Sequence, residues 1–165
     1  MHEKSIELLN KAVADELYAV HQYMYFHFHC DDQGYELLAG LFKKTAIEEM
    51  IHVEKCAERI LFLKGEVEMT TAEEVKQIHD VAEMLKLAAS MEEESAKEYN
   101  IWANECSANA DSMTKQIFES LVGDEERHFD QYDTEIENLK KFGNDYLALQ
   151  SMETSKARQS SNPPH

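Results

Sequence analysis

Apolar side chains recur every three or four positions along most of the chain, a spacing that predicts amphipathic α-helices. The first such stripe comprises Ile6, Leu9, Val13, Leu17, Val20 and Met24. It predicts a helix over residues 3–31. A second helix is predicted over residues 35–64 and ends at Gly65, because glycine readily adopts the left-handed conformation that closes a helix. Two further helices are predicted over residues 80–106 and 112–142.

The segment between the second and third helices, residues 65–79, is too long for a simple turn and lacks a hydrophobic stripe. About 15 extended residues span roughly 50 Å, comparable to the roughly 45 Å of a 30-residue helix. We therefore expect a long crossover. Four long helices with one long crossover predict an all-α, ferritin-like four-helix bundle.

The last part of the chain is polar. Residues 144–153 are predicted to form a short fifth helix, and residues 154–165, which end in two prolines, are expected to be disordered. The expected organisation is thus one bundle over residues 1–153 followed by a tail.

Composition limits the possible functions. The 165 residues suit one domain, and only 5 Gly and 2 Pro favour long helices. The 33 acidic and 16 basic side chains give a formal net charge of −17, which repels nucleic acid and attracts cations. No apolar run is long enough to span a membrane and the first residues lack an apolar signal core, so we expect a cytoplasmic protein with no membrane or nucleic acid partner.

The two halves of the chain repeat each other at an offset of 76 residues. In this register Glu16, Tyr23, Cys30, Phe42, Glu49 and His52 fall on Glu92, Tyr99, Cys106, Phe118, Glu125 and His128. Each half therefore contains a Glu-x-x-His pair and a partner glutamate 33 positions upstream.

These repeated residues predict a two-metal centre. Side chains three residues apart share one face of a helix, so Glu49 projects with His52, and Glu125 with His128. All four glutamates of the repeat lie near the middle of their predicted helices, and four buried carboxylates require positive charge beside them. Oxygen and imidazole ligands without thiolates suit iron or manganese, and this ligand set is the di-iron carboxylate pattern. The alternative is that each side chain is an ordinary surface residue. The occurrence of all six residues in two matching copies argues against it.

At these residues the chain resembles the bacterioferritins, from about residue 6 to residue 150. The resemblance is carried by DELYAVHQY at 15–23, EEMIHVEKCAERILFLKG at 48–65 and DEERH at 124–128. It implies a ferroxidase in which Glu16, Glu49 and His52 bind one iron, Glu92, Glu125 and His128 bind the other, and Glu49 and Glu125 bridge. Tyr23 matches the family's tyrosine beside the site. Tyr23 and Tyr99 are expected either to hydrogen-bond carboxylates or supply an electron during oxygen chemistry, or to be buried core tyrosines bonded to a polar neighbour.

Met50 matches the methionine with which bacterioferritins bind haem, one from each of two subunits across a two-fold axis. It lies about 100° around the helix from Glu49 and should point toward a neighbouring subunit. The alternative for Met50 is a packing role. Lys44 and Gln131 depart from the family, which often has a histidine and a tryptophan at these positions.

The resemblance also implies partners: Fe²⁺, O₂ or H₂O₂, a ferredoxin-type electron donor, and a homo-oligomeric cage of 24 chains in which ferric mineral is stored. A 12-chain shell is the alternative. Acidic residues in GEVEMTTAEE, 65–74, are expected to line routes for cations.

Two other functions remain open from the sequence. One is a di-iron oxidase or peroxidase without mineral storage, and the other is a haem-binding electron carrier or DNA-coating shell. The net charge of −17 argues against DNA coating.

The remaining metal-binding side chains are the cysteines and a group of histidines. Three cysteines without a CxxC pair argue against a disulfide scaffold, and Cys30 and Cys106 are expected at opposite ends of the bundle, beyond disulfide reach. The first helix also carries closely spaced histidines that are either surface residues or, with two aspartates, an extra metal site: His21, His27, His29, Asp31 and Asp32.

Overall fold

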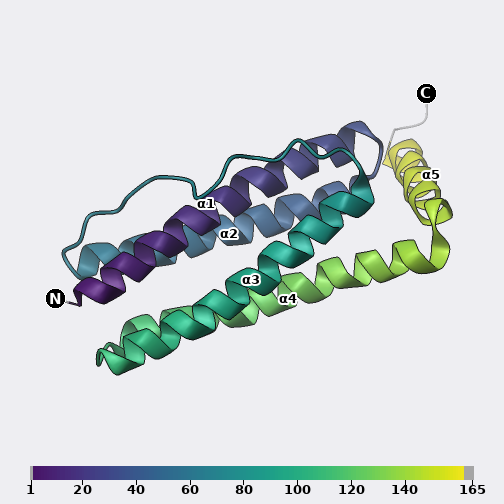
Figure 1. Ribbon diagram of the computed structural model, residues 1–165. Coiled ribbons are helices and arrows are strands. Elements are labelled where there is room, and N and C mark those ends of the chain that lie inside the picture. The colour runs from purple at the N-terminus through teal and green to yellow at the C-terminus, as the bar shows by residue number, and fades with distance from the viewer. Residues whose placement is uncertain (1, 162–165) are drawn as a thin grey trace.

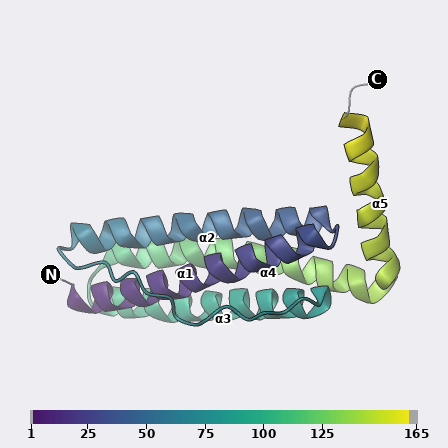
Figure 2. The same cartoon turned by 90° about the horizontal axis from the view of Figure 1, so that it is seen from above.

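The computed structural model describes residues 2–161, which form five helices and, within that range, no strand. The helices are α1 (Glu3–Asp32), α2 (Glu36–Phe62), α3 (Val81–Ala108), α4 (Ser112–Phe142) and α5 (Asn144–Ser161). The first four form a bundle in which α1 lies along α2 and α3 lies along α4 (Figure 1). The helix α5 leaves the end of α4 at a steep angle to the bundle (Figure 2). None of the described helices is long and apolar enough to cross a membrane.

The predicted crossover is present and runs beside α1 (Figures 1 and 2). Two amide side chains of α1 hold it. Asn10 donates to the carbonyl of Glu66 at 2.9 Å and accepts from the amide of Glu68 at 2.9 Å. Gln22 makes the same pair of bonds with the backbone of Lys76, at 3.0 and 2.8 Å. These bonds satisfy backbone groups that a segment without regular structure would otherwise leave open.

The apolar core consists of two clusters, one in each half of the bundle's length. The first includes Phe26, Cys30, Leu38, Phe42 and Met84. The second includes Leu9, Val13, Ile60, Cys106 and Phe118. The two clusters therefore leave a middle layer for polar side chains, and they place Cys30 and Cys106 in separate clusters, as predicted. All three cysteines are buried and free.

The predicted helices agree with the structure to within a few residues, except at the C-terminus. There α5 continues to Ser161, eight residues beyond the predicted end at 153. Disorder of residues 154–165 stays a prediction, and residues 162–165 lie outside the described range.

A partly buried ion pair joins the end of α2 to the start of α4. Asp111 is the N-cap residue of α4 and accepts from the Thr114 amide at 3.2 Å, and the Arg59 guanidinium donates to the same carboxylate at 2.7 Å. Burial favours the neutral form of Asp111, but the hydrogen bonds from Thr114 and Arg59 outweigh burial and lower its pKa to about 2.

We expect Asp111→Ala to lower the free energy of unfolding by about 1 to 2 kcal/mol, because it removes a helix cap and leaves Arg59 without its partner. The measurement is urea unfolding of the metal-free chain. Since the folded-state pKa is depressed below its ordinary value of 3.8, the contribution is complete above that value and is lost as pH falls through about 2. Equal stability of the variant and the wild type at neutral pH would contradict the assignment. Asp111→Asn, which keeps an acceptor but no charge, should fall between them.

Candidate metal centre

The middle layer of the bundle contains four carboxylates and two imidazoles contributed by four helices. Each of the six side chains is at most 1% exposed. They are Glu16 from α1, Glu49 and His52 from α2, Glu92 from α3, and Glu125 and His128 from α4. The structure thus brings together all six residues that the repeat predicts as ligands.

The donor atoms form two overlapping groups whose members lie within 4.8 Å of one another. One group contains Glu16, Glu49, His52 and Glu125, and the other contains Glu49, Glu92, Glu125 and His128. Glu49 and Glu125 belong to both groups, so their carboxylates lie between two adjacent metal positions.

Both imidazoles point Nδ1 into the centre. His52 Nδ1 lies 3.4 Å from Glu16, 3.3 Å from Glu49 and 3.0 Å from Glu125. His128 Nδ1 lies 3.2 Å from Glu49 and 3.4 Å from Glu92. The two rings are 6.2 Å apart between centroids. One imidazole therefore serves each group.

The opposite nitrogen of each ring is held by a carboxylate outside the centre. His52 Nε2 contacts Asp124 at 2.8 Å, and His128 Nε2 contacts Glu48, which Arg127 also contacts at 2.6 Å. A carboxylate at Nε2 keeps the proton there and directs the Nδ1 lone pair to a metal. These residues are not among those predicted from the sequence to form the site, although Glu48 and Asp124 also correspond in the 76-residue repeat.

Two buried tyrosines hold carboxylates of the centre across the two halves of the chain. Tyr23 of α1 donates to Glu92 of α3 at 2.7 Å, and Tyr99 of α3 donates to Glu16 of α1. Burial and the neighbouring carboxylates raise the pKa of both phenols, so each remains a donor. Each tyrosine thus leaves the second oxygen of its glutamate directed at the centre.

Those second oxygens have no hydrogen-bond partner, and the same is true of the other atoms that face the centre. The buried unpartnered atoms are Glu16 Oε2, Glu49 Oε1, His52 Nδ1, Glu92 Oε2, both oxygens of Glu125, and His128 Nδ1. Burying such groups without partners costs several kcal/mol in total. A pair of divalent cations would satisfy all of them, and carboxylate and imidazole donors without sulfur suit iron. The residues present therefore fit a di-iron centre.

The comparisons with known proteins agree with this geometry. The model of the ferritin-like domain family matches residues 6–142. A bacterioferritin of Desulfovibrio desulfuricans is 38% identical over 147 residues, which cover 88% of this chain and 81% of the relative. A bacterioferritin of Rhodobacter capsulatus is 35% identical, with 88% and 91% covered. The chain belongs to the bacterioferritin family.

A solved structure supports the same relationship. The chain superposes on a crystal structure of Desulfovibrio desulfuricans bacterioferritin with a TM-score of 0.88 at 36% identity, covering 90% of this chain and 86% of that one. That structure describes the diiron site of its protein in different catalytic states. The five-helix architecture is thus the bacterioferritin fold.

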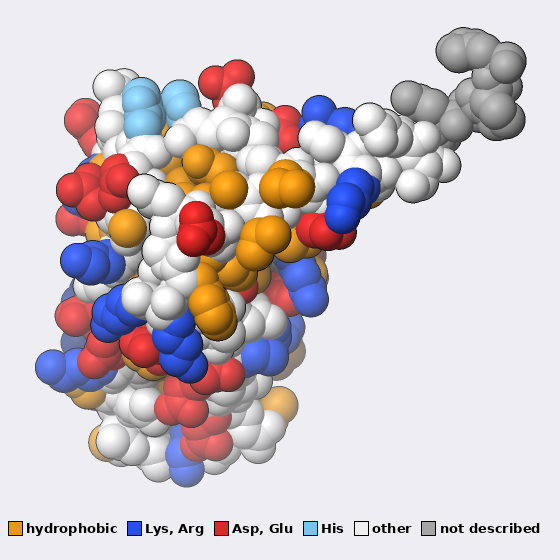
Figure 3. Space-filling view, turned by 90° about the vertical axis from the view of Figure 1, so that its right-hand side faces the viewer, with side chains coloured by type: hydrophobic (Ala, Val, Ile, Leu, Met, Phe, Trp, Pro, Cys, Tyr) orange, Lys and Arg blue, Asp and Glu red, His pale blue; other side chains and the backbone are white. Residues whose placement is uncertain are grey.

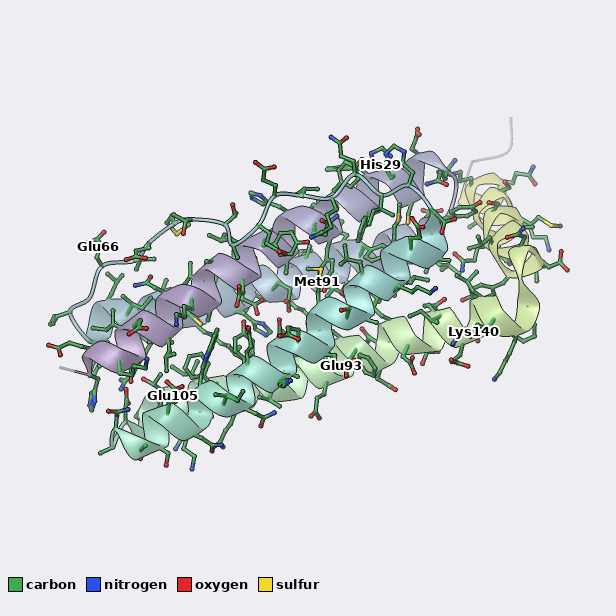
Figure 4. The ribbon with its side chains drawn as sticks, in the orientation of Figure 1. His29, Glu66, Met91, Glu93, Glu105 and Lys140 are labelled. Carbon is green, nitrogen blue, oxygen red and sulfur yellow. The ribbon has the colours of Figure 1, made fainter. Side chains whose placement is uncertain are left out.

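An acidic cavity of about 540 Å³ leads to the metal centre from between α1, the crossover and α3. Its inner wall includes Tyr23 and Glu49. Its other lining residues include Met91, labelled in Figure 4, and the carboxylates of Asp15, Glu73, Glu94 and Glu98. Of the acidic residues expected in the segment 65–74 to line a cation route, Glu73 lies on this cavity.

Met50 lies away from the centre. It is 46% exposed on α2, and Ile47 and Ile51 next to it on that face are also exposed. This is the orientation expected from the 100° rotation relative to Glu49. The face is therefore an apolar surface that another molecule can cover.

The histidines of the first helix do not converge on one point. His27 Nδ1 bonds to the Ala39 carbonyl at 2.8 Å, whereas His29 stacks on His79 of the crossover with ring centroids 4.2 Å apart. Figure 3 shows histidine side chains exposed at the upper left of the molecular surface. Among residues 2–161, groups of three or more converging His, Cys, Asp or Glu donors occur at the carboxylate centre alone. The structure thus favours surface roles for these histidines.

The protonation of the centre opposes metal binding at low pH. Burial disfavours the charged form of His128, but Glu49 and Glu92 outweigh burial and raise its pKa to about 11. Burial and the neighbouring carboxylates raise the pKa of Glu49 and Glu125 well above the ordinary range. Protons therefore occupy the positions that metals would take.

We expect metal binding to release protons and to weaken as pH falls, because His128 must lose its proton before Nδ1 can coordinate. Isothermal titration of the metal-free protein with Zn²⁺, in buffers of different ionisation enthalpy, measures the protons released. The variant Glu125→Gln should bind more weakly and release fewer protons. Binding without proton release would contradict the inferred protonation.

Proposed function

We propose that the chain is a subunit of an iron-storage ferroxidase, which oxidises Fe²⁺ to Fe³⁺ at the metal centre and stores the product as ferric mineral inside a homo-oligomeric shell. The observation that carries the proposal is the pair of overlapping donor groups with unpartnered atoms directed at one buried point. The bacterioferritin relatives support the same function.

The ligand roles follow the two donor groups. Glu16, Glu49 and His52 hold one iron, and Glu92, Glu125 and His128 hold the other. Glu49 and Glu125 bridge, since both groups share them. Four carboxylates around two divalent ions balance their charge and stabilise the ferric product further, because Fe³⁺ binds anionic oxygen ligands more strongly.

The reaction requires two electrons from two Fe²⁺ ions. With hydrogen peroxide, two Fe²⁺, one H₂O₂ and two protons give two Fe³⁺ and two water molecules; with O₂, the same two electrons and two protons give H₂O₂. The protein's contribution is to fix the distance between the ions and the direction of each ligand. Tyr23, through Glu92, and Tyr99, through Glu16, maintain that geometry from outside the centre.

Fe²⁺ reaches the centre through the acidic cavity. Carboxylates along its wall concentrate cations next to Glu49, in agreement with the net charge of −17. The carboxylates on the cavity wall favour entry of a cation over entry of the organic substrate of a di-iron oxidase.

The proposal also includes a haem cofactor bound through Met50. One Met50 sulfur from each of two chains would ligate a haem shared across a two-fold axis, and the exposed Ile47 and Ile51 would cover part of the porphyrin. Two thioether ligands leave no open coordination position, so such a haem transfers electrons rather than binding small ligands. A ferredoxin-type donor would supply electrons for iron release.

A mineral cannot fit inside one bundle, so storage requires a closed shell. We propose 24 chains, built from two-fold dimers, with the cytoplasm as compartment; a 12-chain shell is the alternative. Exposed hydrophobic side chains near α5, including Phe142, Leu149 and Met152, are available for contacts between chains, and Figure 3 shows hydrophobic side chains exposed along this region.

Aerobic loading of the metal-free protein with Fe²⁺ tests storage. We expect far more than two irons per chain to remain after desalting, because a mineral and not the ligand set determines capacity. Glu16→Ala with Glu125→Ala should abolish rapid oxidation while the shell still assembles, and Glu137→Ala on the exposed surface is the matched control. A plateau at two irons per chain would exclude storage but keep the di-iron centre. Wild-type oxidation rates in the double variant would exclude the ligand assignment.

Reconstitution with haem tests the role of Met50. We expect Met50→Leu, which keeps the apolar face, to lose haem binding in a spectroscopic titration, while the rate of Fe²⁺ oxidation at the buried centre stays unchanged. Met69→Leu is the control, because Met69 is exposed on the crossover. Unchanged haem binding in Met50→Leu would contradict the assignment.

A further inference from the structure

An aromatic pair connects the metal centre to the surface of the protein. Tyr99 is fully buried and its hydroxyl donates to Glu16, a proposed ligand. The Tyr99 ring lies 5.5 Å from the ring of Trp102, between centroids, with the planes inclined by 56°. Trp102 is the chain's only tryptophan and is partly exposed. One aromatic contact therefore separates the tyrosine at the ligand from a side chain that meets solvent.

Phe118 of α4 holds this pair in place. Its ring centroid lies 5.8 Å from that of Tyr99 and 5.8 Å from that of Trp102. Phenylalanine is much harder to oxidise than tyrosine or tryptophan, so its role is to fix the geometry. The two easily oxidised side chains of the trio are the buried Tyr99 and the partly exposed Trp102.

Tyr23, the counterpart of Tyr99 in the other half of the chain, has no comparable contact with a partly exposed aromatic ring among the ring contacts of the described residues. The 76-residue repeat aligns Tyr99 with Tyr23 and Trp102 with Phe26, and Phe26 is fully buried. The rings around Tyr23 are Phe42, at 6.2 Å, and Tyr132, at 5.6 Å, both fully buried. The pseudo-symmetric centre is therefore asymmetric in its aromatic surroundings: Tyr99 has a ring contact with a partly exposed side chain, whereas the rings in contact with Tyr23 are buried.

We propose that Tyr99 and Trp102 form a one-electron route between the metal centre and the surface, which operates when a centre meets hydrogen peroxide with only one Fe²⁺ bound. This inference rests on the proposed ferroxidase function. It assigns to Trp102 the role of a surface relay, and to Tyr99 that of a redox-active neighbour of Glu16.

The electron balance explains why a second donor is required. Peroxide takes up two electrons, and one Fe²⁺ supplies one. With Tyr99 as the second donor and the Glu16 carboxylate as acceptor of its proton, one Fe²⁺, one tyrosine, one H₂O₂ and two protons from solvent give one Fe³⁺, one tyrosyl radical, one protonated Glu16 and two water molecules. The Tyr99 proton passes to Glu16 along the existing hydrogen bond as the electron leaves.

Trp102 then returns the electron to Tyr99, and the proton returns from Glu16, in a reversible step that reduction of the Trp102 radical by a solvent-borne reductant draws forward. The indole radical left on Trp102 loses its N–H proton to solvent, and a soluble one-electron reductant such as ascorbate, with one proton from water, restores the tryptophan. The radical is thus reduced at the protein surface and does not oxidise side chains of the apolar core.

Flash photolysis of the metal-free protein tests the route without iron. A photo-oxidised ruthenium tris-bipyridine complex in solution oxidises the exposed indole, and transient absorption follows the radicals. We expect the tryptophan radical of the wild type to decay as a tyrosyl radical appears. In Tyr99→Phe this conversion should be lost, because the oxidisable ring in contact with Trp102 is replaced by phenylalanine. Tyr23→Phe is the matched control and should behave as the wild type.

An identical decay of the tryptophan radical in the wild type and Tyr99→Phe would overturn the proposal. Trp102→Phe keeps an aromatic ring in the same packing and should show no tryptophan radical. Circular dichroism and Zn²⁺ binding of each variant establish that the bundle is intact, so a folding defect is recognised separately.

Freeze-quench electron paramagnetic resonance tests the same route in the presence of iron. The protein receives one Fe²⁺ per chain, then hydrogen peroxide. We expect a protein radical that ascorbate removes quickly in the wild type and about tenfold more slowly in Trp102→Phe, where the radical remains on the buried Tyr99. Equal rates of removal in the two proteins would overturn the relay role of Trp102. With two Fe²⁺ per chain, Trp102→Phe should oxidise iron at the wild-type rate. Failure of the wild type to oxidise iron at all would contradict the ferroxidase proposal and leave the photolysis result unaffected.

Discussion

Burial of four carboxylates in the middle of a helical bundle imposes an electrostatic requirement on everything around them. Such a cluster is unfavourable unless protons or cations neutralise it. Burial accordingly raises the pKa of Glu49 and Glu125, and the charge of the metal-free centre falls partly on the imidazole of His128. The apolar clusters on either side supply the stability that this layer lacks. The metal centre is therefore preorganised: its ligand side chains already converge in the metal-free protein.

The internal repeat explains how a single chain builds a two-metal site. Each half contributes two glutamates and one histidine, and the two halves meet so that Glu49 and Glu125 are shared. The tyrosines cross between halves, Tyr23 to Glu92 and Tyr99 to Glu16, and so tie the halves together at the centre. Pseudo-symmetry thus fixes the metal pair, whereas departures from it, such as tryptophan at 102, are where the two sides can acquire different roles.

Much of this arrangement could be predicted from the sequence, because helical periodicity and the Glu-x-x-His spacing are local signals. The outer carboxylates could not be chosen from among 33 acidic residues by the same means, since the contact of Glu48 with His128 joins positions 80 residues apart. The extent of α5 was also missed, because its residues show no apolar stripe and no glycine marks its end. Distant contacts and unmarked helix ends are settled by tertiary packing, which a sequence pattern does not encode.

The bundle places the acidic cavity and the apolar face that carries Met50 on different surfaces. The acidic cavity is formed mainly by α1, the crossover and α3, whereas Met50 and its apolar neighbours lie on the exposed face of α2. Figure 2 shows α2 on the opposite side of the bundle from α3 and much of the crossover. Under the proposed function, a cation would approach through carboxylates on one side, while subunit contact and haem would occupy the other. The two surfaces have no residue in common, and Glu49 at the cavity is the one proposed ligand that lines either of them. Their other residues can therefore change without replacing a ligand.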